Sequence, residues 1–298
     1  GLVPGQPRLV GTVAQGPTVS VLVTGAGGHL GREVVRVFAD DGPVVGLARR
    51  VLNVADRDAV HRAVSTVRPD IVVNCAAWTD VDGCEGDPER AHRINARAVG
   101  YLREAADEVG AHLVHVSTDF VFDGVASTPY RENDRTGPLN AYGASKLEGE
   151  GLAGPGATVV RTTWLQPADS PGMVERLLVA LPGSGPVEMG DERLACPTFV
   201  ADLVPVLRYL GDQRVPGVVH ATNSGVTSWF GFAREVATAA GLDPGRISRT
   251  ADPGLDGTLP ARRPVFSALD NSVLRALGRP AIRDHRDAIA EAVARAVG

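Results

Sequence analysis

Residues 18–33 read TVSVLVTGAGGHLGRE, which places a β-branched apolar run, a glycine-rich turn and the start of a helix in one segment. The apolar run is typical of a buried strand. Gly25, Gly28 and Gly31 follow it, at the start of an apolar-periodic helix over 30–40. The first glycine permits a tight turn, the second lets backbone amides approach a pyrophosphate, and the third lets the helix pack on the strand. The segment therefore predicts a dinucleotide-binding strand, turn and helix.

Strands and helices continue to alternate after this segment. Further strands are expected at 43–49, 70–77, 112–118 and 157–164, and helices at 56–67, 88–110 and 142–153. Alternation at this spacing indicates a parallel sheet with helices on both faces. The nearly continuous apolar character of each strand is typical of such a covered sheet. The predicted fold class is therefore α/β, with a Rossmann-type doubly wound parallel sheet.

The second half of the chain has a looser pattern. After about Trp164, proline and glycine become frequent, and helices are expected at 172–181, 200–210, 229–241 and 285–297. We expect residues 18–165 to form the nucleotide-binding domain and residues 166–298 a smaller, mixed α/β substrate-binding lobe over the carboxyl ends of the strands. Part of that half, about 195–222, is expected to return to the first domain. Residues 1–17 are expected to be a loosely held tail.

Composition excludes several classes of function. The chain has 298 residues, a net charge of −5 and a pI near 5.8, whereas nucleic acid or an anionic membrane surface would call for a basic excess. No apolar run approaches the roughly 20 residues that span a bilayer, and no secretory leader is expected. Cys75, Cys84 and Cys196 are odd in number and lack the spacing of a zinc site or a disulfide framework. The sequence therefore predicts a cytoplasmic protein without a metal site and without nucleic-acid or membrane partners.

The end of the second strand selects the cofactor in such a domain. An acidic residue there would bind the ribose 2′-hydroxyl of NADH, and a basic one would bind the 2′-phosphate of NADPH. Arg49 and Arg50 occupy this region, and no carboxylate does. NADPH is therefore the expected cofactor and NADH the alternative. Both arginines could also be solvated surface residues without a ligand.

Lys146 is the only lysine among 30 lysine and arginine residues. It follows Tyr142 by four residues, so both side chains lie on one face of the predicted helix. A nearby ammonium lowers the pKa of a phenol, which would let Tyr142 donate a proton to a carbonyl oxygen that receives hydride. Arginine is too bulky to replace a compact ammonium that also bonds cofactor ribose. The alternative is a chance Y-x-x-x-K pair on an exposed helix.

A hydroxyl that polarises the same carbonyl is expected at the end of the preceding strand. Ser117 and Thr118 both stand there. The alternative is a strand-end hydroxyl that only satisfies nearby backbone. We predict Thr118, Tyr142 and Lys146 as the catalytic residues.

The G-x-x-G-x-x-G spacing of the turn is typical of the short-chain dehydrogenases. The runs RPDIVVNCAAWTDVDGCEGDPERAHRINARAV (68–99), HLVHVSTDFVFDG (112–124), AYGASKLEGE (141–150), CPTFVADL (196–203) and ARRPVFSALDNSVLRALG (261–278) together resemble one family among them, the dTDP-4-dehydrorhamnose reductases. These enzymes reduce the 4-keto group of a dTDP-6-deoxyhexose. The blocks occur in the family's order and spacing from about Val19 to the C-terminus.

The resemblance implies a set of site residues. It assigns Thr118, Tyr142 and Lys146 to catalysis. It implies substrate contacts at Thr79, Thr118, Asp119, Phe120, Tyr142 and Trp164. It implies cofactor contacts at Gly25, Gly28, His29, Leu30, Gly31, Arg49, Arg50, Asn53, Val54, Ala76, Ala77, Trp78, Tyr142 and Lys146. The implied partner is a dTDP-4-keto-6-deoxyhexose, in the biosynthesis of dTDP-rhamnose or of a natural-product deoxysugar. A homodimer and the Mg²⁺ dependence of some relatives are expectations that the sequence does not decide.

Four positions depart from the family pattern. His29 replaces a common Gln, Asn53 an Asp, Phe120 a Tyr, and Trp78 a smaller ring. The pocket is therefore expected to be drier and bulkier than in relatives, which leaves the exact sugar undecided.

Three other functions compete with a ketoreductase. Related 4,6-dehydratases carry Thr-Asp-Glu at the strand end, whereas this chain has Thr118, Asp119 and Phe120, so dehydration is not expected. A nucleotide-sugar epimerase would retain its cofactor through turnover. A non-catalytic NADP-binding regulatory subunit would not need the Thr118, Tyr142 and Lys146 set.

Overall fold

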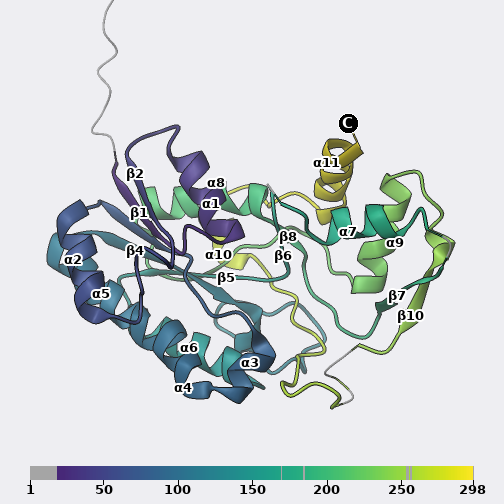
Figure 1. Ribbon diagram of the computed structural model, residues 1–298, viewed down its shortest axis with the longest axis horizontal. Coiled ribbons are helices and arrows are strands. Elements are labelled where there is room, and N and C mark those ends of the chain that lie inside the picture. The colour runs from purple at the N-terminus through teal and green to yellow at the C-terminus, as the bar shows by residue number, and fades with distance from the viewer. Residues whose placement is uncertain (1–18, 169, 184, 253–254, 256, 298) are drawn as a thin grey trace, which may run out of the picture.

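The computed structural model describes residues 19–168, 170–183, 185–252, 255 and 257–297, and the predicted tail at 1–17 lies outside them. Within the described residues, the largest sheet has six parallel strands in the order β2-β1-β3-β4-β5-β9 (Figure 1). The strands are β1 (Val21–Thr24), β2 (Val44–Leu47), β3 (Ile71–Asn74), β4 (His112–Thr118), β5 (Thr158–Thr162) and β9 (Gly217–His220). The predicted strands are therefore present.

Helices cover both faces of this sheet. On one face lie α1 (His29–Phe38) and α8 (Val200–Asp212); on the other lie α2 (Arg57–Val67), α5 (Ala98–Val109) and α6 (Ala141–Ala153). Successive strand residues point to opposite faces. Val21 and Val23 accordingly pack in the first core and Leu22 in the second. The predicted doubly wound α/β fold is confirmed.

The strand order reverses next to β1, which lies between β2 and β3. At such a reversal the connections leave toward opposite faces, and a crevice forms outside the carboxyl ends of the strands. The glycine turn and the start of α1 lie at this point. The edge strand β2 is less covered than expected: Val45 is 37% exposed, because among the described strands β2 pairs on one side only.

The second half forms a smaller body beside the sheet (Figure 1). Its core joins α7 (Met173–Ala180), α9 (Trp229–Ala239) and α11 (His285–Val297) through side chains such as Leu177, Phe232 and Ile289. Two short parallel pairs accompany them: β7 (Val187–Gly190) with β10 (Ile247–Thr250), and β6 (Leu165–Gln166) with β8 (Thr198–Phe199). From the same half, α8 packs on the large sheet, β9 pairs with β5, and α10 (Ser272–Ala276) lies beside β9. The domain boundary at residue 165 stays a prediction.

The long helix expected over 88–110 is divided. It consists of α4 (Pro88–His92), a π-helical segment η1 (Arg93–Arg97) and α5. A further helix, α3 (Val81–Gly86), precedes it and was not predicted. The reason is that Gly83 and Gly86 disfavour a helix, whereas the Asp80 side chain caps α3 by accepting from Gly83 N. π-Helical turns are frequent at functional sites.

Candidate active site

The glycine turn is as tight as the sequence predicted. Gly25 has a φ of +68°, and Gly28 N donates to Gly25 O across 3.0 Å. A Cβ on Gly31 would lie 2.3 Å from Gly25 O and 2.8 Å from Gly25 C. Real Cβ atoms do not approach backbone this closely, so both positions require glycine. Gly28 is the N-cap of α1 and has no side-chain cap, so the first amides of the helix remain available for an anion.

Replacing Gly31 with alanine should therefore disrupt the turn. We expect a destabilisation of about 1–3 kcal/mol from the overpacked Cβ, together with weaker cofactor binding, measured by thermal denaturation and dinucleotide titration. Gly27→Ala is the matched control for stability, because its Cβ would meet only the Ala48 Cβ at 3.4 Å. Equal losses of stability in the two variants would contradict this steric account.

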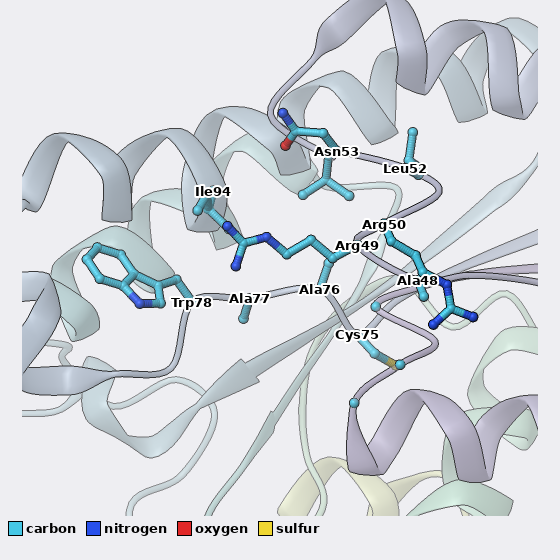
Figure 2. A pocket seen from close by; sticks show the side chains of 14 residues that line it. Ala48, Arg49, Arg50, Leu52, Asn53, Cys75, Ala76, Ala77, Trp78 and Ile94 are labelled. Carbon is cyan, nitrogen blue, oxygen red and sulfur yellow. The ribbon is translucent and has the colours of Figure 1, made fainter.

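A cavity of about 410 Å³ opens beside the turn. Figure 2 shows it between the ends of β1, β2 and β3. The Arg49 side chain extends across it toward Ile94, while Arg50 points the other way, beside Ala48. Both arginines are exposed. The remaining predicted residues that line it are Gly25, Gly28, Asn53, Val54, Ala76, Ala77 and Trp78.

Asn53 and Asp56, which also follow β2, have local partners. Asn53 Oδ1 accepts from Ala55 N at 3.2 Å. Asp56 caps α2, since its side chain accepts from Ala59 N at 3.0 Å. A helix cap of this kind contributes about 1 kcal/mol to stability. Asp56 therefore has a structural function that needs no ligand.

A second cavity of about 450 Å³ shares Gly28, Cys75 and Ala77 with the first, so the two adjoin. It contains the other predicted residues: His29, Leu30, Gly31, Thr79, Thr118, Asp119, Phe120, Tyr142, Lys146 and Trp164. The structure thus brings all the predicted site residues to two neighbouring cavities at the carboxyl ends of the strands. What each residue binds stays a prediction.

Thr118 and Tyr142 meet in the second cavity. Thr118 Oγ1 donates to Asp119 Oδ1 at 3.0 Å and accepts from Phe120 N at 3.2 Å. The Tyr142 ring packs edge-on against Phe120, with centroids 5.6 Å apart. Burial raises the pKa of Tyr142 above its ordinary value, and a hydrogen bond with Thr118 partly opposes that rise. Thr118 thus serves the local backbone and also contacts the phenol.

Ser117, the other candidate hydroxyl, has a different partner. Its Oγ donates to Glu150 Oε1 at 2.5 Å. Glu150 also accepts two hydrogen bonds from Arg161, at 2.9 and 2.7 Å, and all three side chains are buried. A buried ion pair needs such additional hydrogen bonds. Ser117 is therefore part of a structural network, and Thr118 is the hydroxyl next to Tyr142.

Lys146 is 2% exposed, and its Nζ donates to Val116 O at 2.7 Å. Burial lowers the pKa of Lys146 to about 8, and Glu150 opposes this. The sequence predicted that Lys146 lowers the pKa of Tyr142. In this structure the pKa of Tyr142 is instead raised. The reason is that desolvation of the phenol dominates, while Nζ is directed at the Val116 carbonyl.

Asn95 is a site residue that sequence reasoning missed. It is fully buried in η1; its Oδ1 accepts from Trp78 N at 2.8 Å, and its Nδ2 donates to Trp78 O at 3.1 Å and to Ser145 Oγ at 3.0 Å. It therefore fixes the Trp78 segment against α6, the helix that carries Tyr142. The sequence offered no signal for Asn95, because residues 88–97, PERAHRINAR, are largely polar.

Two tryptophans stack at the junction of the two bodies. Trp164, between β5 and β6, and Trp229, at the start of α9, have centroids 3.9 Å apart and an interplanar angle of 7°. Trp164 has a φ of +43°, a strained backbone conformation for a residue with a side chain. Such strain persists when surrounding contacts enforce it. The stack with Trp229 is one such contact, and it places Trp164 at the second cavity.

Asp119 provides a buried carboxyl in the same cavity. Burial raises its pKa, and the nearby hydroxyl groups of Ser267, Thr163 and Thr118 oppose the rise. Within the described part of the chain, no group of three or more His, Cys, Asp or Glu residues could hold a metal ion. No helix in that part is both long and apolar enough to cross a bilayer.

Comparison with known proteins places these cavities in context. A family model described as the RmlD substrate binding domain matches residues 19–297. The chain is 40% identical to the dTDP-4-dehydrorhamnose reductase of Mycolicibacterium smegmatis, over 93% of this chain and 86% of that protein. It is 39% identical to a probable dTDP-4,6-dihydroxy-2-methyloxan-3-one 4-ketoreductase of Streptomyces antibioticus, over 91% and 93% of the two chains. The crystal structure of dTDP-4-dehydrorhamnose reductase from Bacillus anthracis in complex with NADP matches with a TM-score of 0.85 and 28% identity, over 91% and 97% of the two chains.

Proposed function

The chain belongs to the dTDP-4-dehydrorhamnose reductase family, and on that basis we propose that it reduces the 4-keto group of a dTDP-4-keto-6-deoxyhexose with NADPH. The family predicted from the sequence is confirmed, and so is the enzyme class, an oxidoreductase. We further propose that the product enters the biosynthesis of dTDP-rhamnose or of a natural-product deoxysugar.

One observation carries the proposal. The glycine turn and the Thr118, Tyr142 and Lys146 set line adjoining cavities, so a dinucleotide in the first and a sugar in the second would meet at Tyr142. The names of the relatives support a reductase over an epimerase or a regulatory subunit.

The first cavity fits a nicotinamide dinucleotide. A Cβ at Gly31 would fill the space of the turn, and the uncapped amides at the start of α1 suit a pyrophosphate. When bound, NADPH supplies the hydride. Arg49 or Arg50 would hold its 2′-phosphate, Asn53 and Val54 would line the adenosine, and Ala76, Ala77 and Trp78 would flank the dinucleotide.

The second cavity supplies the groups that act on the carbonyl. Tyr142 would donate its phenolic proton to the sugar oxygen as negative charge develops there. Thr118 Oγ1 would turn its hydrogen from Asp119 to the same oxygen and polarise it. Lys146, as the ammonium, would stabilise the tyrosinate that is left and would bond the cofactor ribose. Thr79, Asp119, Phe120 and Trp164 would position the sugar.

Cofactor preference gives a separate prediction. Replacing Arg49 and Arg50 together with alanine should raise the KM for NADPH about 10- to 100-fold, because charge-assisted hydrogen bonds to the 2′-phosphate are lost. The KM for NADH, which lacks this phosphate, should change little and serves as the internal control. Initial rates with each cofactor test this, and a parallel loss with both would place the arginines outside phosphate recognition.

The assay of the proposed function uses purified protein, NADPH and dTDP-4-keto-6-deoxyglucose, with and without a 3,5-epimerase. Oxidation of NADPH, followed by absorbance, is expected with at least one form of the sugar. Product analysis by NMR then gives the sugar and the configuration at C4. No oxidation with either form would refute the proposal, and tightly retained NAD without net consumption would favour the epimerase.

We also propose a cytoplasmic location and a homodimer, and neither nucleic acid nor membrane as partner. Light scattering tests the assembly. The Mg²⁺ dependence of some relatives is tested by adding EDTA or Mg²⁺ to the same assay.

A further inference from the structure

A chain of buried hydrogen bonds leads from β1 to Lys146. Thr24 Oγ1 donates to Asn74 Oδ1 at 2.6 Å, Asn74 Nδ2 lies 3.0 Å from His115 Nδ1, and His115 Nε2 lies 3.4 Å from Lys146 Nζ. All four side chains are buried, with Thr24 and His115 at 0% exposure. The chain crosses from β1 through β3 to β4 and ends on α6.

The orientation of the Asn74 amide fixes the histidine tautomer. The Asn74 oxygen accepts from Thr24 Oγ1 and also from Ala76 N at 3.1 Å, and a backbone amide can only donate. The other end of the amide is therefore the NH₂ group, and it donates to His115 Nδ1. Since Nδ1 accepts, His115 is neutral and carries its hydrogen on Nε2.

Two donors then face each other at 3.4 Å. His115 Nε2–H points to Lys146 Nζ, and an ammonium has hydrogens but no lone pair to receive it. A neutral amine does have a lone pair, so it can accept a hydrogen bond from Nε2–H while it donates one to Val116 O. The ring therefore favours the neutral amine over the ammonium.

We propose that His115 is a positioning residue for the reductase reaction, holding Lys146 against the Val116 carbonyl and favouring its neutral amine in the free enzyme. The catalytic role of His115 rests on the proposed function, whereas its effect on Lys146 rests on the hydrogen bonds alone.

The other groups around Lys146 act as follows. On α6, Glu150 favours the ammonium, although it is already paired with Arg161 and Ser117, and the Tyr142 phenol has a raised pKa. After β3, burial raises the pKa of the Cys75 thiol to about 12, so that it is neutral. On β4, burial and Lys146 hold the pKa of His115 well below its usual range. These surroundings fit a Lys146 pKa of about 8.

The sign of the pH dependence follows. Below its pKa Lys146 is the ammonium that stabilises the Tyr142 tyrosinate, and that charge is lost as the pH rises through about 8. Activity should therefore fall on the alkaline side. Asn74→Ala removes the amide that fixes the tautomer, so His115 can place a lone pair toward Nζ, which would stabilise the ammonium and move that decline to higher pH.

The single lysine makes a direct test available. Protein labelled with ¹³Cε-lysine gives one lysine resonance, whose titration reports the Lys146 pKa without substrate or cofactor. The wild-type midpoint should lie near 8, and Asn74→Ala should raise it by about one pH unit, as one gained hydrogen bond implies. His112→Gln is the control and should leave it unchanged, because His112 is buried in the same strand but contacts Thr158 Oγ1.

A wild-type midpoint above 10, or one that Asn74→Ala does not move, would overturn the proposal. If that variant does not fold, His115→Leu serves instead, since it removes the Nε2–H donor that faces Nζ and should also raise the midpoint. The alkaline limb of kcat/KM, measured with NADPH and the keto sugar, should shift in parallel. Absence of all turnover would refute the proposed function while the NMR titration still decides the position of His115.

Discussion

Replacing Tyr142 with phenylalanine should lower kcat about 10²- to 10⁴-fold, the usual contribution of a positioned general acid. The phenol is buried and contacts Thr118 in the second cavity, so water is a poor substitute as proton donor. The ring packs edge-on against Phe120 and would keep that contact as phenylalanine. The effect should therefore fall on kcat, while the dissociation constant for NADPH should change little.

Tyr130→Phe is the matched control. Tyr130 is also buried, and its hydroxyl donates to Asp123 Oδ1 at 2.6 Å, outside both cavities. This variant should lose some stability but keep its turnover. Steady-state kinetics and thermal denaturation of both variants separate the two effects. A Tyr142→Phe enzyme within a few-fold of wild type would mean that another group donates the proton.

The parts of the fold that depend on local pattern were predictable. β4 was expected at 112–118 and occupies His112–Thr118, because an apolar run followed by a turn specifies a buried strand. The glycine turn was also predictable from local pattern, because only glycine meets its steric requirement and the three glycines are visible in the sequence. Predicted site residues such as Gly25, Ala76 and Thr118 gathered because each ends or follows a strand, and parallel strands end at one edge of the sheet.

The parts that depend on tertiary contacts were not predictable. Asn95 lies in a segment that resembles an ordinary helix, and only its contacts with Trp78 and Ser145 make it significant. His115 lies between Val114 and Val116 in a buried strand, and its tautomer depends on Asn74 from another strand. The pKa of Tyr142 was predicted in the wrong direction, because the sequence placed Lys146 nearby but gave no measure of desolvation.

Lys146→Arg should keep the fold and lose most of the turnover. Nζ lies between Val116 O at 2.7 Å and His115 Nε2 at 3.4 Å, with 2% exposure, so a guanidinium has no room without displacing one of them. Arginine keeps the positive charge, but its planar guanidinium cannot take the place of a compact ammonium that also bonds the cofactor ribose. Overpacking should cost about 1–3 kcal/mol of stability, too little to unfold a domain of this size.

Lys146→Met is the matched control for charge, because it retains an unbranched side chain but cannot carry a proton. If compact shape alone mattered, Met would outperform Arg; if charge alone mattered, Arg would outperform Met. We expect both to lose most of kcat, because the tyrosinate needs an ammonium and the ribose needs a compact donor. Circular dichroism confirms the fold, and kcat with NADPH measures the loss. Near-full activity in Lys146→Arg would show that position 146 does not require lysine and that positive charge alone supports Tyr142.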